Sequence, residues 1–228
     1  MALNYGPRLV TDGLVLALDA ADINSYPGTG STWFDLSGNN NHVTAVNGPD
    51  WISSGYFSHT SNSYFSGVGG QSIPIGNSTY TMLVWAKQRS EFGWGANYGF
   101  ISIGGYGENN QSNALRTQDN TDGHFWHYWW LNDVGVSSND AGISLDQWFL
   151  VAATFDGLNR RIWINGNLSA SDIPGSNHDV KTTDIQISKT YGDEYQRGDI
   201  AVARIYNRAL TSTEMMSTFI NEKTRFGL

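Results

Sequence analysis

The stretch WFLVAATFDGLNRRIWING, residues 148–166, decides the fold class of this chain. Two largely apolar runs, Trp148–Phe155 and Arg161–Ile164, are separated by a short segment that contains Gly157. The second run ends at Asn165-Gly166, a dipeptide suited to the positive φ angles of a type I′ turn. The pattern predicts an antiparallel hairpin followed directly by another tight turn.

Similar short runs recur on both sides of this hairpin, with turn-forming residues between them. The clearest is Tyr80–Gln88, whose alternate residues would face opposite sides of a sheet. Residues 22–50 and 104–124 are rich in Gly, Asn and Ser and are expected to be loops. The other predicted strands are Leu14–Leu18, Phe100–Ile103, Phe125–Leu131, Asp184–Ser188 and Ile200–Tyr206. This pattern is typical of an all-β sandwich.

One helix is predicted near the end of the chain. Thr211 and Glu214 have the spacing of a capping box, in which each side chain hydrogen-bonds the backbone of the other residue. The expected apolar stripe consists of Met215, Met216, Phe219 and Ile220. About three turns are too few for an isolated helix, so we expect it to pack on the sandwich, with Arg208 as an anchor.

Composition and charge restrict the expected partners. The 228 residues include 13 Lys+Arg and 21 Asp+Glu, which gives a formal net charge of −8. Such a chain is poorly suited to neutralising phosphates, so we expect no nucleic-acid partner. It is equally unsuited to docking on anionic lipid. The absence of cysteine excludes a disulfide scaffold, a Cys nucleophile and a Cys-ligated zinc site.

The length is compatible with one domain over residues 1–228, because β-sandwiches often reach ~200–250 residues as a single unit. No apolar run is long enough to span a bilayer, so membrane insertion is not expected. The first residues lack the apolar core of a secretory signal, which predicts synthesis in a cytoplasm without a signal peptide. A content of 26 Gly and 9 Trp, with only 15% charged residues, nevertheless suggests a protein that acts outside a cell.

Four segments carry a resemblance to a known family. They are Gly13–Asp22, Trp33–Asn39, Gln147–Gly166 and the region from Gly198 to the Glu214 helix, which includes Ile205–Leu210. In this order they resemble the laminin-G-like branch of the concanavalin A-like lectins and glucanases, most closely the single-domain versions of marine tailed bacteriophages. The resemblance implies a jelly-roll β-sandwich of two antiparallel sheets with one short C-terminal helix. It also implies a place on a virion surface, after synthesis in the host cytoplasm.

Glycosidases of this fold resemble one another in carrying acidic residues at positions i, i+2 and i+4 of one strand. Such residues share one face of the strand, where a retaining pair needs about 5–5.5 Å between its carboxyl groups. This sequence contains no two acidic residues spaced by two. The adjacent pair Asp193-Glu194 would point to opposite faces. We therefore expect no enzyme activity and no catalytic residues.

The resemblance also implies a calcium site, because laminin-G-like domains often bind one Ca²⁺ through carboxylates and carbonyls. Asp19 and Asp35 occupy the matching positions, whereas Ala201 stands where the family often has an acidic residue. Asp199 lies two residues before Ala201, on the same strand face, and is the expected substitute. The alternative is that Asp19 and Asp35 cap turns through side-chain hydrogen bonds.

Aromatic residues provide the candidate carbohydrate site, because sugars stack on exposed rings. Trp94 and Tyr98 lie in a Gly-flanked segment that is expected to be a loop. In the run 125–130, alternation places Trp126, Tyr128 and Trp130 on one face and the other three residues on the opposite face. Trp126 and Tyr128 join Trp94 and Tyr98 as candidates if that face is open. The alternative is that both faces are covered.

These observations lead to three hypotheses about function. The first is a non-catalytic carbohydrate-binding module, used for adhesion or decoration on a bacteriophage particle and possessing a glycan partner. The second is a structural virion protein that binds other virion proteins or forms a homo-oligomer. The third and most remote is an unusual glycoside hydrolase.

Overall fold

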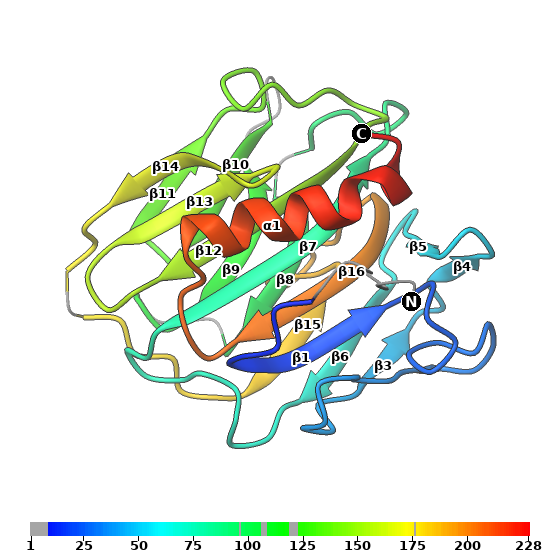
Figure 1. Cartoon of the computed structure of the whole chain (residues 1–228), viewed down its shortest axis with the longest axis horizontal. Coiled ribbons are helices and arrows are strands. Elements are labelled where there is room, and N and C mark those ends of the chain that lie inside the picture. The colour runs from blue at the N-terminus through cyan, green and yellow to red at the C-terminus, as the bar shows by residue number, and fades with distance from the viewer. Residues whose placement is uncertain (1–8, 96, 106–108, 119–122, 176) are drawn as a thin grey trace, which may run out of the picture.

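The computed structural model describes residues 9–95, 97–105, 109–118, 123–175 and 177–228. Two antiparallel sheets face each other, and one helix, α1 (Ser212–Glu222), lies across the outer face of the first sheet (Figure 1). A 3₁₀ turn, η1 (Lys223–Phe226), follows the helix directly. The architecture confirms the predicted all-β jelly-roll sandwich with one short C-terminal helix.

The first sheet, called sheet A, has the strand order β14-β13-β12-β7-β16-β5-β4, and β1 pairs with the remaining length of β16. Its strands are β1 (Leu14–Asp19), β4 (Asp50–Ile52), β5 (Tyr56–Ser58), β7 (Tyr80–Gln88), β12 (Trp148–Phe155), β13 (Arg160–Ile164), β14 (Asn167–Asp172) and β16 (Gly198–Tyr206). The long strands β7 and β16 are neighbours at the centre of sheet A, and both are buried over almost their whole length.

The second sheet, called sheet B, has the order β11-β10-β9-β8-β15-β6-β3-β2. Its strands are β2 (Thr32–Trp33), β3 (Val43–Val46), β6 (Tyr64–Val68), β8 (Gly99–Ile103), β9 (Asn113–Gln118), β10 (His124–Tyr128), β11 (Asp133–Val136) and β15 (Asp184–Ile187). Strands distant in sequence are therefore neighbours, and β15 lies between β6 and β8.

Two apolar clusters hold these layers together. The larger fills the space between the sheets and includes Trp33, Phe57 and Phe65, all at most 1% exposed. The smaller lies between sheet A and the helix, where Trp85 and Met215 are fully buried. Sheet A is thus covered on both faces along its centre, whereas no helix of the described residues lies over the outer face of sheet B.

The hairpin predicted from residues 148–166 is confirmed. β12 and β13 pair as antiparallel neighbours, with Val151 opposite Ile164. Asn165 and Gly166 have φ values of 49° and 79°, the left-handed pair that a type I′ turn requires. The Asp156 side chain accepts hydrogen bonds from two backbone N–H groups and so closes the preceding turn.

The capping box is also present. The Thr211 hydroxyl accepts a hydrogen bond from the Glu214 N–H, and the Glu214 carboxylate accepts one from the Thr211 N–H. Arg208 pairs with Glu214 at 2.6 Å and so anchors the helix as expected. The predicted stripe was wrong at Ile220, which is 54% exposed, because the buried face follows Met215, Thr218 and Phe219.

Three other predictions need correction. Residues 22–50 contain the short strands β2 and β3, and residues 104–124 contain β9. The strand expected over Phe125–Leu131 ends at Tyr128, because Trp130 and Leu131 adopt positive φ angles of 66° and 56°. Backbone of that kind cannot continue a ladder.

The free side of β1 is occupied by the segment that follows it. The Ala17 carbonyl accepts a hydrogen bond from the Leu36 N–H at 2.9 Å, and the Ala17 N–H donates to Asp35 Oδ1 at 2.8 Å. Two residues further along β1, the Asp19 N–H donates to the Ser25 hydroxyl. The backbone groups of this strand are thus satisfied without another strand beside it.

Candidate functional site

The outer face of sheet B carries a row of mostly small and polar side chains. Strand pairing places the members of this row opposite one another across the sheet; they are Thr32, Thr44, Ser66, Gln186, Ser102, Ala114, Tyr128 and Asp133. The neighbouring row on the inner face is mostly apolar and includes Phe65, Ile187 and Leu115. The sheet therefore has one core face and one polar face.

The aromatic residues of β10 follow the predicted alternation. Phe125, His127 and Trp129 are fully buried, whereas Trp126 and Tyr128 are half-buried on the outer face. The expectation that one face is core is confirmed. The other face is partly covered, since both of its rings are half-buried and the Trp126 indole nitrogen is buried. Sheet B therefore presents aromatic rings on its polar face.

These rings are held in place by packing and charge. The Trp126 ring lies flat over Gly135, where a Cβ atom would approach it to 2.9 Å. One face of the Tyr128 ring is covered by the Arg116 guanidinium at 3.8 Å, and Arg116 pairs with Glu194 at 2.5 Å. Burial raises the pKa of the Tyr128 hydroxyl, so it stays a neutral donor and acceptor at physiological pH.

The aromatic row continues into the loop after β15. Trp130 lies 6.2 Å from Tyr128 and packs edge-on against Tyr191 at 5.2 Å. Tyr191 is 43% exposed, which makes it the most open ring of this group. A ring with one apolar face toward solvent and a hydroxyl at its tip suits C–H stacking by a sugar.

Beside Tyr191 lies a polar pocket of about 230 Å³. Its lining consists of Ser66, Gly104, Gly105, Asp184, Gln186, Lys189, Thr190, Tyr191 and Gly192. Asp184 offers a carboxylate and Gln186 an amide, both from the outer side of β15. The pocket thus places hydrogen-bonding groups of both kinds next to an aromatic ring.

The surroundings of two side chains in this pocket, Gln186 and Lys189, are well defined. The Gln186 Oε1 atom is buried and has no hydrogen-bond partner among the described residues. Such an atom loses its water without a replacement, which costs free energy and leaves the amide nitrogen as the part of Gln186 that can serve a ligand. The Lys189 ammonium lies 4.4 Å from the Tyr64 ring and 4.9 Å from the Tyr195 ring, which fixes its direction.

Trp94 and Tyr98 are not part of this face. Trp94 packs edge-on against Phe125 and at a tilt of 43° against Phe149, both of which lie in the core. This position requires Gly123, since a Cβ atom there would lie 2.4 Å from the Trp94 ring. Tyr98 is half-buried, and its ring lies against Gly95. Trp94 is half-buried and packs against the core on one side, so it lies apart from the candidate rings of sheet B.

The three predicted calcium ligands do not form a common site. Asp19 pairs with Arg225 through both carboxylate oxygens, and Asp199 pairs with Lys87 at 2.8 Å. Asp35 is buried and accepts backbone N–H groups. Within the described ranges, no three His, Cys, Asp or Glu residues are arranged to hold a metal ion. The alternative role in turns is present, since Asp19 and Asp35 each accept the N–H two residues on.

Asp35→Ala should lower the free energy of unfolding by about 2–3 kcal/mol, because three backbone N–H groups lose their acceptor. The loss should be the same in calcium and in EDTA when measured by urea denaturation. Asp35→Asn, which retains one carbonyl oxygen, should lose less. A wild-type protein that is stabilised by calcium, with the effect abolished in Asp35→Ala, would contradict a purely structural role.

Sequence reasoning missed the pocket residues Asp184, Gln186, Lys189 and Tyr191. The predicted strand Asp184–Ser188 already placed Asp184 and Gln186 on one face by alternation. What could not be seen was that β15 lies between β6 and β8, beside the loop that carries Tyr191. That neighbourhood is set by tertiary topology.

Comparisons with known proteins complete the description. A family model described as the concanavalin A-like lectin/glucanases superfamily matches residues 60–216. Among proteins of curated function, none matches this sequence. Within the described ranges, no helix has the length and apolarity needed to cross a membrane.

Three solved structures illustrate the similarity of fold. The receptor-binding domain of botulinum neurotoxin C/D mosaic serotype superposes with a TM-score of 0.71 at 17% identity, over 93% of this chain and 52% of that one. For the binding domain of Paraclostridial Mosquitocidal Protein 1 the values are 0.65 and 21%, over 92% and 52%. The Trypanosoma rangeli sialidase in complex with sialic acid gives 0.67 and 14%, over 93% and 33%. The chain thus spans about half the length of the toxin domains.

Proposed function

We propose that this chain, which belongs to the concanavalin A-like lectin/glucanases superfamily, is a non-catalytic carbohydrate-binding module. The fold of this superfamily serves many functions, so the proposal rests on the chain's own surface. The observation that carries the proposal is the outer face of sheet B. There the exposed Tyr191 ring adjoins a pocket with the Asp184 carboxylate, the Gln186 amide and the Lys189 ammonium. This combination of a ring for stacking and polar groups for hydroxyls is what sugar recognition requires.

The pocket supports binding better than hydrolysis. Glycoside hydrolysis needs two carboxyl groups about 5–9.5 Å apart, on either side of the scissile bond. Asp184 is the one acidic residue in the described lining of the pocket. The toxin domains with this fold are named as binding domains. The match to the sialidase covers only a third of the sialidase chain. A binding role is therefore the proposal, and an enzymatic role is not.

The finer proposal is that the module serves adhesion or decoration on a bacteriophage particle. It rests on the sequence segments that resemble the phage proteins and on the composition, which is rich in Gly and Trp and poor in charged residues. A shallow site for one sugar binds weakly, and many copies on a particle would raise the apparent affinity without new contacts. The partners are then glycans on one side and neighbouring virion proteins on the other.

Tyr191→Ala should weaken glycan binding at least about tenfold, because the variant removes the most open ring while leaving the sheet intact. The measurement is a glycan array with wild-type protein, in calcium and in EDTA, followed by titration of the best glycan. Gln186→Ala should weaken binding through the loss of a hydrogen bond. Phe34→Ala, at a ring that is 39% exposed and outside the pocket lining, is the matched control.

Unchanged affinity in both pocket variants would contradict this site. A blank array from folded protein that forms defined oligomers would favour the structural virion role. A signal that disappears in EDTA would return calcium to the proposal. Cleavage of a reporter glycoside would contradict the non-catalytic assignment.

A further inference from the structure

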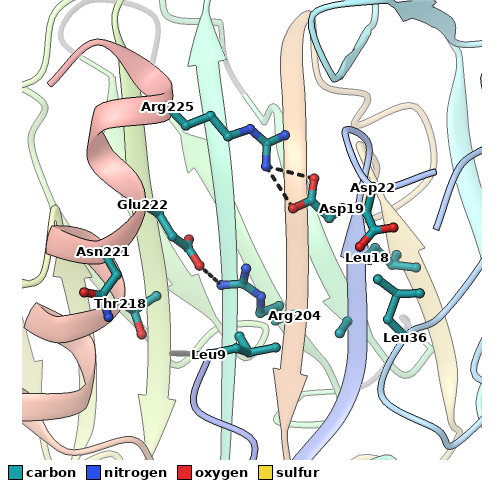
Figure 2. A pocket seen from close by; sticks show the side chains of 11 residues that line it. Leu9, Leu18, Asp19, Asp22, Leu36, Arg204, Thr218, Asn221, Glu222 and Arg225 are labelled. Atoms are coloured by element: carbon teal, nitrogen blue, oxygen red, sulfur yellow. Dashed lines mark hydrogen bonds and ion pairs between the residues drawn. The ribbon is translucent and has the colours of Figure 1, made fainter. Parts of the chain in front are cut away.

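A second cleft lies on the opposite side of the molecule, on the outer face of sheet A beside the helix (Figure 2). Its volume is about 330 Å³, within the range of small-molecule sites. The floor is formed by β1 and by Arg204 of β16, and one wall by Thr218, Asn221 and Glu222 of α1. The other wall consists of Asp22 and Leu36, and Leu9 closes one end.

Two ion pairs cross this cleft from the sheet to the C-terminal segment. The Arg204 guanidinium is 2.7 Å from Glu222, with side-chain exposures of 8% and 16%. Arg225 reaches back to Asp19 and binds both carboxylate oxygens at 2.8 Å. Figure 2 shows the two pairs side by side, with their charged groups directed into the space between helix and strand. Their charges cancel within each pair.

The charge balance restricts what could occupy the cleft. An anion that approached either arginine would meet Asp19, Asp22 and Glu222, which outnumber the two cations. A cation would find one carboxylate outside these pairs, that of Asp22, and would have to displace Arg204 or Arg225 to reach a second one. A neutral molecule with several hydroxyl groups avoids both costs, because each hydroxyl can donate to a carboxylate or accept from a guanidinium.

The remaining lining matches the other properties of such a molecule. Leu9, Leu18 and Leu36 supply an apolar surface, against which the C–H faces of a sugar ring would lie. The exposed Asn221 amide offers both a donor and an acceptor at the mouth. Asp22 uses Oδ1 to accept from the Asn24 backbone and side chain, which leaves Oδ2 for a ligand.

We propose that this cleft is a second saccharide site, which binds one neutral pyranose between α1 and β1. The proposal extends the carbohydrate-binding function, but it uses residues on the opposite sheet and does not depend on Tyr191. A module with sites on both broad faces would be bivalent. It could therefore join two glycans, or hold one glycan on each side when copies are arrayed.

The test is a titration of ¹⁵N-labelled protein with neutral methyl glycosides of glucose, galactose, mannose and N-acetylglucosamine. The Trp85 indole N–H donates to Glu222 at 2.6 Å, directly behind the cleft, and so reports its occupation. One of these glycosides should shift the Trp85 signal at millimolar concentration, while methyl glucuronide should bind at least about tenfold more weakly. The Trp85→Phe variant assigns the signal.

Asn221→Trp should weaken this binding at least about tenfold, because the larger side chain fills the mouth of the cleft. Ile220→Trp adds the same side chain next to it, at a position that is 54% exposed and outside the lining, and should bind normally. Tyr191→Ala should retain the Trp85 shift. No shift with any glycoside at tens of millimolar, or a shift that persists in Asn221→Trp, would overturn the proposal. Glycan binding that depends on Tyr191 alone would leave the proposed function intact and remove the second site.

Discussion

Trp85→Ala should lower the free energy of unfolding by about 4 kcal/mol. The Trp85 ring is fully buried and stacks on Phe226 at 4.0 Å and on Phe219 at 5.9 Å. Its indole N–H also donates to Glu222, so one side chain joins sheet A to both α1 and η1. Urea denaturation followed by circular dichroism measures the loss.

Trp85→Phe is the matched control, because it keeps an aromatic ring and removes the hydrogen bond. It should cost about 1–2 kcal/mol. The smaller loss would separate the contribution of stacking from that of the polar contact. A Trp85→Ala protein within about 1 kcal/mol of wild type would show that the helix docks without this residue.

Acidification from pH 7 to pH 5 should lower the free energy of unfolding by about 4 kcal/mol. Burial lowers the pKa of His59 and of His178 to about 4 each. Both rings therefore stay neutral in the fold while the unfolded chain takes up protons below about pH 6.5. Stability is lost as the pH falls through that value, at about 2 kcal/mol for each ring by pH 5. Burial lowers the pKa of His127 as well, which adds to the effect.

The surroundings of His178 and His127 explain why these two rings resist protonation. His178 stacks on Trp129 at 3.7 Å, and the Arg160 guanidinium lies 4.5 Å from the same Trp129 ring. His127 contacts the Tyr80 hydroxyl at 2.5 Å. A second positive charge in this buried region would face Arg160, which is itself fully buried and paired with Asp172.

Urea denaturation at pH 7, 6 and 5 measures this dependence. His178→Gln should reduce the loss between pH 7 and pH 5 by about 2 kcal/mol, since one of the titrating rings is removed. Acidic residues cannot produce the same profile: an Arg208 hydrogen bond lowers the pKa of Glu214 to about 2, so its contribution declines only below about pH 4.5. Equal stability at pH 7 and pH 5 would contradict the neutral buried state.

Local signals in the sequence were sufficient for much of the fold. The hairpin of β12 and β13 and the capping box of α1 depend on contacts within about twenty residues, and both are present. The short strands β2 and β3 were missed because their segment is rich in Gly and Asn. They are strands because they extend a sheet formed by distant residues. Ile220 was misplaced because the helix position is set by Trp85, far away in the chain.

The candidate site was predictable only in part. Alternation alone placed Trp126 and Tyr128 on one face, and the structure agrees. Trp94 packs partly against the core, where Gly123, nearly thirty residues later, leaves space for its ring. The pocket beside Tyr191 arises from the position of β15 in the sheet order, which no local pattern encodes.

The occupied side of β1 bears on how many copies can be crowded together. A sheet that ends in a strand with open N–H and C=O groups can recruit the same strand from another molecule, and this reaction accelerates with concentration. At β1 the groups of Ala17 are already bonded to Asp35 and Leu36, so sheet A offers no template on that flank. Dense display, which weak binding would require, is therefore compatible with discrete subunits that do not polymerise through β1.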